Sequence, residues 1–399
     1  MKYDFTTLID RSTHGSMKWN GMKRTNPEVP SGIVPLSVAD MELKNPPEIV
    51  EGLKQYLDEM ILGYTTATDQ YYEAVISWMK RRHSWEIKKE WIVTSPGVVT
   101  GFQAAIKSLI QPKEGVIILS PVYYPFASSI KRFGAEVVSV ELINQQGEYF
   151  IDFEGLEEVC SHPNNKVLLF CSPHNPVGRV WTKEELEKVG KLCLDHHVTI
   201  ISDEIHNDLI LAGNEHTVFA TLSDELQDHM IVCTSPSKTF NLAGMQTSNI
   251  IIPNETLREN FAKALEDISG SWLNVMGYKA CELAYNHSEA WLEELLKLIE
   301  HNRDTVVEFM SQYFPEVIVS PLQGTYLLWM DFRAFGLTKE ELEEKMVKEA
   351  LWFTDEGYLF GDGGIGFERI NLACPTWVIE EALERLKKAF NKQDSDKLK

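Results

Sequence analysis

Between residues 91 and 252 the chain alternates short apolar runs with longer stretches of helical character. The apolar runs are rich in β-branched residues, and the stretches between them repeat apolar residues at helical spacing. Strands of this kind are typical of a parallel sheet that is covered by helices on both faces. We therefore predict an α/β fold with a mostly parallel central sheet. Its six expected strands carry the runs "WIVTS", "GVIILS", "KVLLFC", "VTIIS", "MIVC" and "SNIII".

The character of the chain changes near residue 286. One amphipathic stretch, residues 289–314, predicts a long helix, and "PEVIVSPLQGTYLLWMDF" predicts a pair of strands. A length of 399 residues exceeds one ordinary core, so two domains are expected. We predict a large domain over residues 45–285 and a smaller α+β domain made of residues 1–44 and 286–399.

Charge and cysteine usage narrow the function classes. The formal net charge of −21 at pH 7 disfavours binding to nucleic acid or to acidic membrane surfaces. No apolar run approaches the roughly 18 residues of a membrane-spanning helix, and the opening "MKYDFTTLIDRSTHG" lacks the apolar core of a signal peptide. The six cysteines are scattered without metal-binding spacing, so we expect no metal and a reduced, cytoplasmic protein.

Polar clusters follow four of the expected strands at the point where each strand ends. The clusters are "SPVYYPF", "CSPHNPVG", "SDEIH" and "TSPSK". Parallel strands place their carboxyl ends at one edge of a sheet, and ligands of open α/β sheets bind in the crevice outside that edge. We expect the four clusters to form one shared site.

Each cluster suits one task in a site for pyridoxal phosphate. The amine of Lys238 can form a Schiff base with this aldehyde, and Asp203 can keep the ring nitrogen protonated, which makes the ring a better electron sink. Asn175 can donate to the ring oxygen, and Tyr123 can stack on the ring. Taken singly, these residues have plainer interpretations: an exposed lysine, a strand-end carboxylate, a turn former and a core tyrosine. Their occurrence at four strand ends together favours the cofactor.

The phosphate of such a cofactor needs backbone amides at the start of a helix. The stretch "TSPGVVTGFQAA" offers Gly97, Val98 and Val99 there, directly after an expected strand. Glycine also permits close approach of the backbone. Ser235 and Ser237 add hydroxyl donors beside the lysine, so we predict that these five residues bind the phosphate.

Arg369 lies in the expected small domain, after the glycine-rich stretch "FGDGGIG". A guanidinium there can bind the α-carboxylate of an amino-acid substrate through two parallel hydrogen bonds. The alternative is an arginine in a surface ion pair.

Several long motifs together carry a resemblance to a known family. They are "PLSVADME", "SPVYYPF", "LLFCSPHNPVGRVW", "PSKTFN" and "DEGYLFGDGGIGFERINLA", the last with one variable position. The chain resembles fold-type I pyridoxal phosphate enzymes of the class I/II aminotransferase superfamily. Within them it resembles the carbon–sulfur lyase branch, the cystathionine β-lyase and cystalysin group. The resemblance covers nearly the whole chain and implies the fold-type I PLP-dependent transferase fold.

The resemblance implies the same roles for five residues already singled out. It makes Lys238 the Schiff-base lysine and proton shuttle and Asp203 the partner of the ring nitrogen. It implies that Asn175 bonds to the ring oxygen, that Tyr123 stacks on the ring and that Arg369 binds the substrate carboxylate. Asn175 is also implied to bind substrate.

The resemblance also adds site residues. Tyr64 resembles the tyrosine that reaches the cofactor phosphate of the neighbouring subunit, which implies a homodimer with shared active sites. Tyr124 is implied at the mouth of the site, and Ala39 in an N-terminal segment that covers the substrate. Where aminotransferases carry a tyrosine and a phosphate-binding arginine, this chain has His206 and Gln246. The histidine fits the lyase branch and is placed with the cofactor-binding residues.

The activity implied is that of a PLP-dependent carbon–sulfur β-lyase. Its substrates are implied to be L-cystathionine, L-cysteine or related cysteine thioethers and disulfides, cleaved by α,β-elimination to pyruvate, ammonia and a thiol or sulfide. Lys238 removes the Cα proton in this scheme, and Tyr123 or Tyr124 supplies any proton that the leaving thiolate needs. Two alternatives stay open: an aminotransferase, and a regulator of lyase fold that acts through a protein partner.

Overall fold

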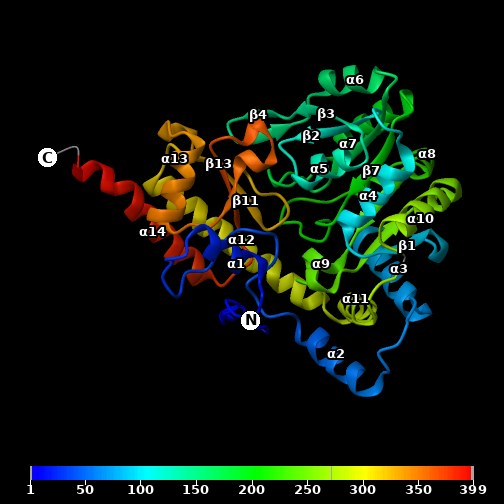
Figure 1. Ribbon diagram of the computed structural model, residues 1–399, viewed down its shortest axis with the longest axis horizontal. Coiled ribbons are helices and arrows are strands. Elements are labelled where there is room, and N and C mark those ends of the chain that lie inside the picture. The colour runs from blue at the N-terminus through cyan, green and yellow to red at the C-terminus, as the bar shows by residue number, and fades with distance from the viewer. Residues whose placement is uncertain (1, 271, 397–399) are drawn as a thin grey trace.

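The computed structural model describes residues 2–270 and 272–396 (Figure 1). A seven-stranded sheet organises one part of the molecule and a four-stranded sheet the other. The long helix α12 (Glu289–Tyr313) extends from the first part toward the second, and it confirms the helix predicted over residues 289–314.

The larger sheet has the strand order β1-β9-β8-β7-β6-β2-β3, in which β9 runs antiparallel to both neighbours and the other described pairs are parallel. All six predicted strands are present. The additional strand, β3, lies at an edge, where its exposed Glu136 and Glu141 weaken the apolar pattern. The strands are β1 Ile92–Ser95, β2 Gly115–Ser120, β3 Glu136–Glu141, β6 Asn165–Cys171, β7 Thr199–Asp203, β8 Met230–Thr234 and β9 Ser248–Ile251.

Helices cover both faces of this sheet, as predicted. In β6, Val167 and Leu169 belong to the core that includes side chains of α4, α5 and α10, whereas Leu168 and Phe170 belong to the core with α6 and α7. Alternating side chains of one strand therefore reach two apolar layers, which explains why the strand has no polar face. The helices are α4 Val98–Leu109, α5 Pro125–Arg132, α6 Phe153–Ser161, α7 Lys183–Asp195 and α10 Glu255–Ser269.

The smaller sheet is antiparallel, in the order β10-β11-β13-β12. The N-terminal segment joins it, because Leu36 N donates to Phe353 O (2.9 Å) and Leu36 O accepts from Asn371 N (2.8 Å). The predicted limits of the two domains stay a prediction. The elements are β10 Ile318–Val319, β11 Leu327–Asp331, β12 Asp355–Glu356, β13 Phe367–Asn371, α13 Lys339–Glu344, a π-helix over Lys345–Ala350, and α14 Thr376–Asp396.

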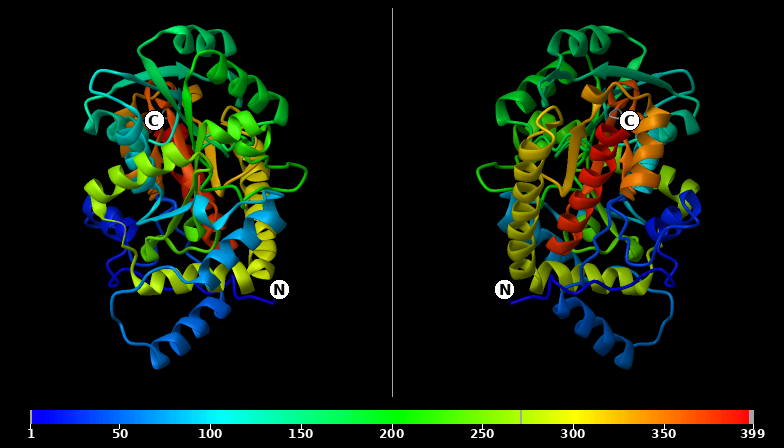
Figure 2. Two further views of the ribbon diagram at one scale, coloured as in Figure 1. Left: turned by 90° about the vertical axis from the view of Figure 1, so that its right-hand side faces the viewer. Right: turned by 90° about the vertical axis from the view of Figure 1, so that its left-hand side faces the viewer.

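The remaining described helices and strands lie outside the two larger sheets. Helix α2 and the loop after it project from the body of the molecule (Figure 2). Among the described helices, none combines the length and apolar character that a bilayer crossing requires. The elements are α1 Met17–Thr25, α2 Pro47–Glu59, α3 Asp69–His83, α8 Asp224–Asp228, α9 Pro236–Thr239, α11 Val275–His287, β4 Ile143–Gln145 and β5 Glu148–Phe150.

The register of the parallel strands places the four polar clusters at one edge. Cys171, at the end of β6, pairs with Asp203 at the end of β7, which pairs in turn with Cys233 near the end of β8. Strand β2 runs parallel to β6 and ends at the same edge with Ser120. The prediction that these strands end side by side is confirmed.

Candidate active site

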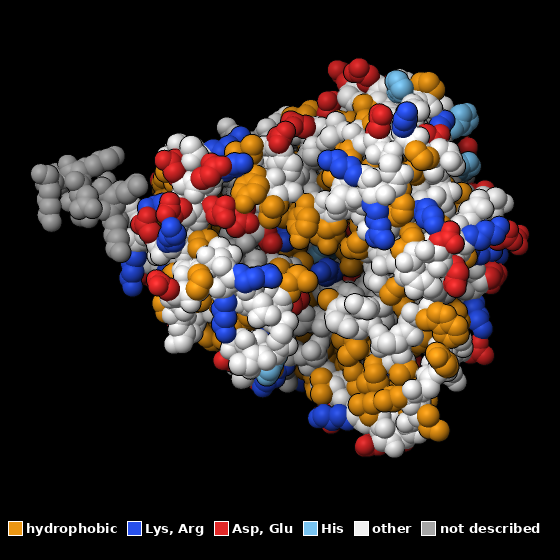
Figure 3. All heavy atoms as spheres, in the orientation of Figure 1, with side chains coloured by type: hydrophobic (Ala, Val, Ile, Leu, Met, Phe, Trp, Pro, Cys, Tyr) orange, Lys and Arg blue, Asp and Glu red, His pale blue; other side chains and the backbone are white. Residues whose placement is uncertain are grey.

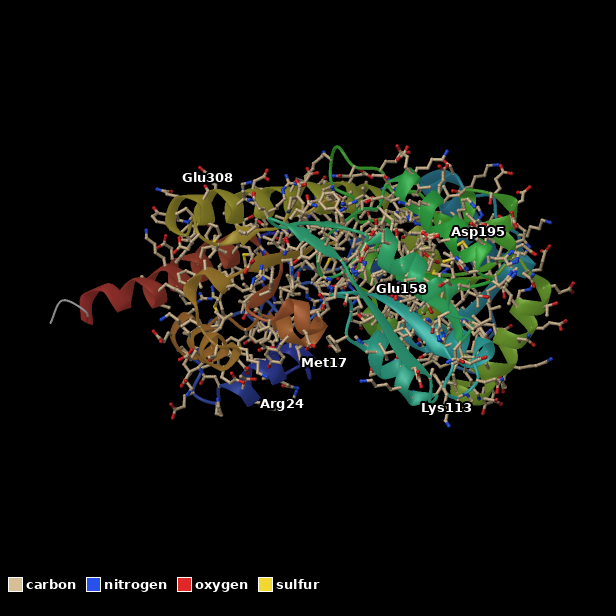
Figure 4. All side chains as sticks on the ribbon, turned by 90° about the horizontal axis from the view of Figure 1, so that it is seen from above. Met17, Arg24, Lys113, Glu158, Asp195 and Glu308 are labelled. Carbon is tan, nitrogen blue, oxygen red and sulfur yellow. The ribbon has the colours of Figure 1, made fainter. Side chains whose placement is uncertain are left out.

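A cavity of about 380 Å³ lies at the carboxyl edge of the larger sheet. Val38 and Ala39 of the N-terminal segment and Arg369 of β13 also line it. Met17, at the start of α1, stands at its rim and is labelled near the middle of the molecule in Figure 4. The predicted site residues that line it are Ala39, Gly97, Val98, Val99, Tyr123, Tyr124, Asn175, Asp203, His206, Ser237, Lys238 and Arg369.

Lys238 is carried by α9, a single helical turn between β8 and β9. Its Nζ donates to the carbonyl oxygen of Ala39 at 2.6 Å. Burial lowers the pKa of Lys238 to about 8, and the nearby charge of Arg369 also lowers it while Asp40 and Asp203 raise it. The amine therefore loses its proton far more easily than an exposed lysine, as a base or nucleophile requires.

Asp203 is the last residue of β7 and is buried. Its Oδ1 accepts from Ile205 N at 3.2 Å. Burial raises the pKa of this carboxyl to about 7, although the Ile205 amide and the charge of Lys238 lower it. A cationic N–H placed against Asp203 would restore the charged carboxylate, and this is what the protonated ring nitrogen of pyridoxal phosphate offers.

His206 enters the same cavity in a neutral state. Burial holds the pKa of this imidazole well below its usual range, with further lowering by the charges of Lys238 and Arg369. Its Nδ1 is buried and has no hydrogen-bond partner among the described residues. The ring of Tyr326 lies edge-on, with its centroid 6.0 Å away. The imidazole is thus free to bond to a cofactor or substrate.

The start of α4 fits a phosphate. Gly97 has a φ of +92°, and no atom lies within 4 Å of the position where a Cβ would stand, so an anion can approach the backbone. No acidic side chain occupies the first turn after it, where the amides of Val98 and Val99 have no helical acceptor. Ser237 Oγ lies 2.7 Å from Ser235 Oγ, and because Ser235 donates its single proton to Thr247 O, the Ser237 hydroxyl donates to Ser235 and must rotate to donate to a phosphate.

Arg369 is buried and held from two sides. Its Nη1 donates to Asn175 Oδ1 at 2.7 Å, and its Nη2 donates to Asp355 Oδ2 at 2.6 Å. Its Nε is buried without a partner among the described residues. The guanidinium also lies 4.7 Å from the ring centroid of Phe360. This arginine is therefore not the surface ion pair of the plainer interpretation, and it keeps donor capacity for a substrate carboxylate.

Asp355 was not identified from the sequence, although it sets the orientation of Arg369. It pairs with Arg369 across β12 and β13, and its Oδ2 also accepts from Val38 N at 2.9 Å. The carboxylate thus connects the guanidinium to the N-terminal segment. Both residues lie in the motif "DEGYLFGDGGIGFERINLA", but the motif does not show that they pair, because the pairing depends on the strand register.

Tyr123 and Tyr124 form one wall of the cavity. The ring centroids of Tyr123 and Tyr124 are 5.5 Å apart. Burial raises the pKa of both phenols, so both are protonated at neutral pH and can donate. Tyr124 keeps 46% of its surface exposed and lies at the mouth, whereas Tyr123 lies deeper.

A charged network fixes the N-terminal segment over the cavity. The buried ammonium of Lys18 pairs with Asp40 at 3.0 Å and with Glu42 at 3.3 Å, and Arg11 pairs with the same two carboxylates at 2.8 and 2.7 Å. These four residues flank Ala39, whose carbonyl accepts from Lys238. The sequence analysis missed them because they meet only in the folded chain.

Tyr326 completes this region and was likewise not identified from the sequence. Its hydroxyl donates to Ala39 O at 2.9 Å, so the phenol and the Lys238 amine share one carbonyl.

Two predicted residues do not line the cavity. Ser235 caps α9: its Oγ accepts from Ser237 N at 3.0 Å and lies 2.7 Å from Thr247 O, to which it donates. Tyr64 is fully exposed, with its ring 5.9 Å from that of Trp272. Within a single chain, Tyr64 therefore does not reach this site.

The chain matches the family model for aminotransferase class I and II over residues 31–386. It belongs to this family. It is 41% identical over 358 residues to the cystathionine β-lyase PatB of Bacillus subtilis, an alignment that covers 90% of this chain and 92% of that protein.

Two solved structures are also similar. Cystalysin from Treponema denticola, which contains a pyridoxal 5'-phosphate cofactor, is 51% identical with a TM-score of 0.97, over 98% of this chain and 100% of that one. The PLP-bound C–S lyase from Staphylococcus hominis is 31% identical with a TM-score of 0.90, over 98% of both chains.

The departure from the aminotransferase pattern at Gln246 has a structural counterpart. Gln246 is exposed and does not line the cavity. Of the residues predicted to bind the phosphate, Gly97, Val98, Val99 and Ser237 line this cavity.

Proposed function

We propose that this protein is a pyridoxal phosphate-dependent carbon–sulfur β-lyase. It cleaves L-cystathionine, L-cysteine or related cysteine thioethers and disulfides to pyruvate, ammonia and a thiol or sulfide. The proposal rests on the placement of Lys238, Asp203 and Arg369 in one cavity. The similarity to proteins named cystathionine β-lyase, cystalysin and C–S lyase favours this reaction over others of the family.

The geometry supports a proposal for the residues that would hold the cofactor. Lys238 would bond to the cofactor, Asp203 would hold the proton on the ring nitrogen, and Tyr123 would lie against the ring. Asn175 uses its amide oxygen to accept from Arg369, so its NH₂ group is left to donate to the ring oxygen. Bound pyridoxal phosphate supplies an electron sink for the negative charge that develops at Cα.

The chain's own residues then bind the substrate and move protons. Arg369 binds the α-carboxylate and orients the Cα–H bond toward Lys238. The neutral Nζ takes the Cα proton, and the resulting ammonium donates to Ala39 O. The Cβ–S bond breaks, and its electron pair leaves with sulfur. Hydrolysis of the unsaturated amino acid that remains gives pyruvate and ammonia.

The leaving thiolate departs toward the mouth of the cavity. Tyr124 is the phenol closest to solvent there, and Tyr123 adjoins it. Their protonated state lets either one supply a proton to sulfur. Because a thiolate is a good leaving group, this assistance contributes less than it would for an alkoxide.

A substrate panel tests the proposal. We expect pyruvate from L-cysteine, L-cystathionine and S-methyl-L-cysteine, together with the matching sulfide or thiol. L-serine, whose leaving group is an alkoxide, should react far more slowly. Equal rates for serine and its sulfur analogues would contradict a carbon–sulfur lyase.

Substitution of Arg369 by lysine is expected to lower kcat/KM by about tenfold or more. A compact ammonium cannot donate the two parallel hydrogen bonds that a planar guanidinium offers to a carboxylate. The single nitrogen of lysine also cannot reproduce the two separate nitrogens that donate to Asn175 and Asp355. Steady-state kinetics on an α-carboxylate substrate and on its α-amide measure the effect.

The amide should be a poor substrate of the parent and should lose little further in the Arg369→Lys variant. An equal penalty for acid and amide would show that Arg369 has a merely structural role.

We further propose that the working unit is a homodimer with shared active sites. An exposed apolar surface surrounds Tyr64, and Ile61 within it is 88% exposed. Apolar side chains gather over α2 and α11 at the lower end of the face in Figure 3. A surface of this kind marks an interaction site, and a second copy places Tyr64 against the partner's phosphate site. The surface consists of Leu57, Met60, Ile61, Leu62, Tyr64 and Trp272.

Mixed dimers of Tyr64→Phe and Lys238→Ala subunits test this sharing. If Tyr64 serves the partner's site, one site in each mixed dimer has both defects and the other has none. About half of the parental activity per dimer should then return. No recovery, or a monomer by sedimentation at working concentration, would refute the proposal.

A cytoplasmic location is also proposed. The cysteines at 160, 171, 193, 233, 281 and 374 are all free and buried. Buried thiols without disulfides are typical of a reducing compartment.

A further inference from the structure

The segment from Asp203 to Asp208 separates two cavities. Asp203, Ile205 and His206 line the active-site cavity, whereas Asn207 and Asp208 line a second cavity of about 350 Å³ behind it. A residue on the far side of this wall can therefore act on the active site without touching substrate or cofactor.

The Asp208 carboxylate, with a side chain only 1% exposed, joins α3 and α9 to the segment that carries it. Its oxygens accept from Trp78 Nε1 at 3.0 Å, from His83 Nε2 at 2.8 Å and from Thr239 Oγ1 at 2.7 Å. Trp78 and His83 belong to α3, and Thr239 is the residue directly after Lys238. Three donors on one buried carboxylate make a rigid junction.

The carboxylate stays ionised at this junction. Burial raises the pKa of Asp208. The hydrogen bond and charge of His83 and the hydrogen bond of Thr239 lower it by more, so the pKa lies below its usual value. Because an ionised carboxylate only accepts, the Thr239 hydroxyl must donate to it. The direction of this hydrogen bond is thus fixed.

The hydrogen bond acts on the helical turn that carries the lysine. Helix α9 has only four residues and is anchored at its start by Ser235. Thr239 is the last of them, and Phe240 after it packs edge-on against Trp78, with ring centroids 5.7 Å apart. Both ends of α9 are therefore fixed, and Lys238 projects from between them to Ala39 O.

We propose that Asp208 and Thr239 are positioning residues that hold Lys238 in line with the substrate Cα proton. The proposal rests on the proposed function of Lys238 as the base and deepens it. A rigid turn keeps Nζ within reach of the proton, and small displacements of reacting groups reduce rates strongly. The residues themselves touch neither substrate nor cofactor.

A pair of conservative variants tests the hydrogen bond. Thr239→Val keeps the shape and removes the donor, whereas Thr239→Ser keeps the donor. We expect Thr239→Val to lower kcat by about tenfold with KM changed by less than about twofold, and Thr239→Ser to stay near the parent. Cα-deuterated S-methyl-L-cysteine should show a larger isotope effect on kcat with Thr239→Val, because proton removal becomes slower.

Thr234→Val is the matched control. Thr234 is another buried threonine, and its hydroxyl donates to Asn249 O at 3.0 Å, so its loss should leave kcat and the isotope effect unchanged. Equal losses of kcat and melting temperature in Thr234→Val and Thr239→Val would overturn the proposal, because they would indicate general destabilisation. Parental kcat and isotope effect in Thr239→Val would overturn it as well.

A second readout does not depend on turnover. The rate at which apoenzyme attaches pyridoxal phosphate to Lys238, measured by borohydride trapping and peptide mass spectrometry, should fall in Thr239→Val and recover in Thr239→Ser. If the parent protein eliminates no thiol, the proposed function fails, but this rate still decides the positioning role. An unchanged attachment rate would then overturn it.

Discussion

Replacing Lys238 with alanine is expected to remove both the covalently held cofactor and nearly all turnover. The variant loses the nucleophile that bonds to pyridoxal phosphate and the base that takes the Cα proton. Loss of proton transfer alone costs about 10²–10⁴-fold in rate. Pyruvate release and the visible absorbance of the purified protein, before and after borohydride, measure the two losses.

Lys345→Ala provides a matched control for this prediction. Lys345 is also buried, but it pairs with Glu349 at 3.4 Å and does not line the active-site cavity. Its removal should leave cofactor attachment intact. If borohydride fixed the cofactor to any lysine other than Lys238 in the parent protein, the assignment of Lys238 would be wrong.

Substitution of Asp203 by alanine is expected to keep cofactor attachment but to lower kcat by at least about 100-fold. Without the carboxylate, nothing at this position holds the proton on the ring nitrogen, and oriented electrostatic interactions of this kind often contribute about 3 kcal/mol or more. The comparison of borohydride-trapped cofactor with kcat separates the two effects.

Glu204→Gln tests whether loss of another buried carboxylate on this segment lowers kcat as much as loss of Asp203 does. Glu204 follows Asp203 but faces away from the cavity, where its Oε2 lies 2.9 Å from His216 Nε2. We expect its substitution to change kcat by less than about threefold, as for a site without contact to the reacting atoms. Near-normal turnover of Asp203→Ala would reject the role of Asp203.

The large sheet and the location of the site could be predicted because both depend on local patterns. Continuous apolar runs identify buried parallel strands, and the carboxyl ends of such strands share an edge. Lys238, Asp203, Asn175 and Tyr123 all follow those runs closely, so the structure brings them into one cavity. The edge strand β3 escaped prediction because its outward residues are charged.

Residues that act through distant partners could not be predicted in this way. Asp355 meets Arg369 only through the register of β12 and β13, and Tyr326 meets Ala39 across 287 residues of sequence. The buried pairing of Lys18 and Asp40 likewise exists only after folding. Asp40 and Asp355 fall inside motifs that carry the family resemblance, but those motifs do not show which residues they contact.

Ser235 is a different case, because a local signal was available. A serine directly before a proline at the first helical position is a typical N-cap, and such a hydroxyl accepts from the helix backbone. Ser235 does this and turns away from the cavity, whereas Ser237 lines it.

A carbon–sulfur lyase breaks a Cβ–S bond without an amino-group acceptor, and this distinguishes it from an aminotransferase. The most direct measurement is the product balance from L-cysteine with purified holoenzyme and no added keto acid. We expect pyruvate, ammonia and sulfide in equal amounts over many turnovers. Absence of pyruvate in this reaction, with keto-acid exchange only after an acceptor is added, would contradict this expectation and identify an aminotransferase.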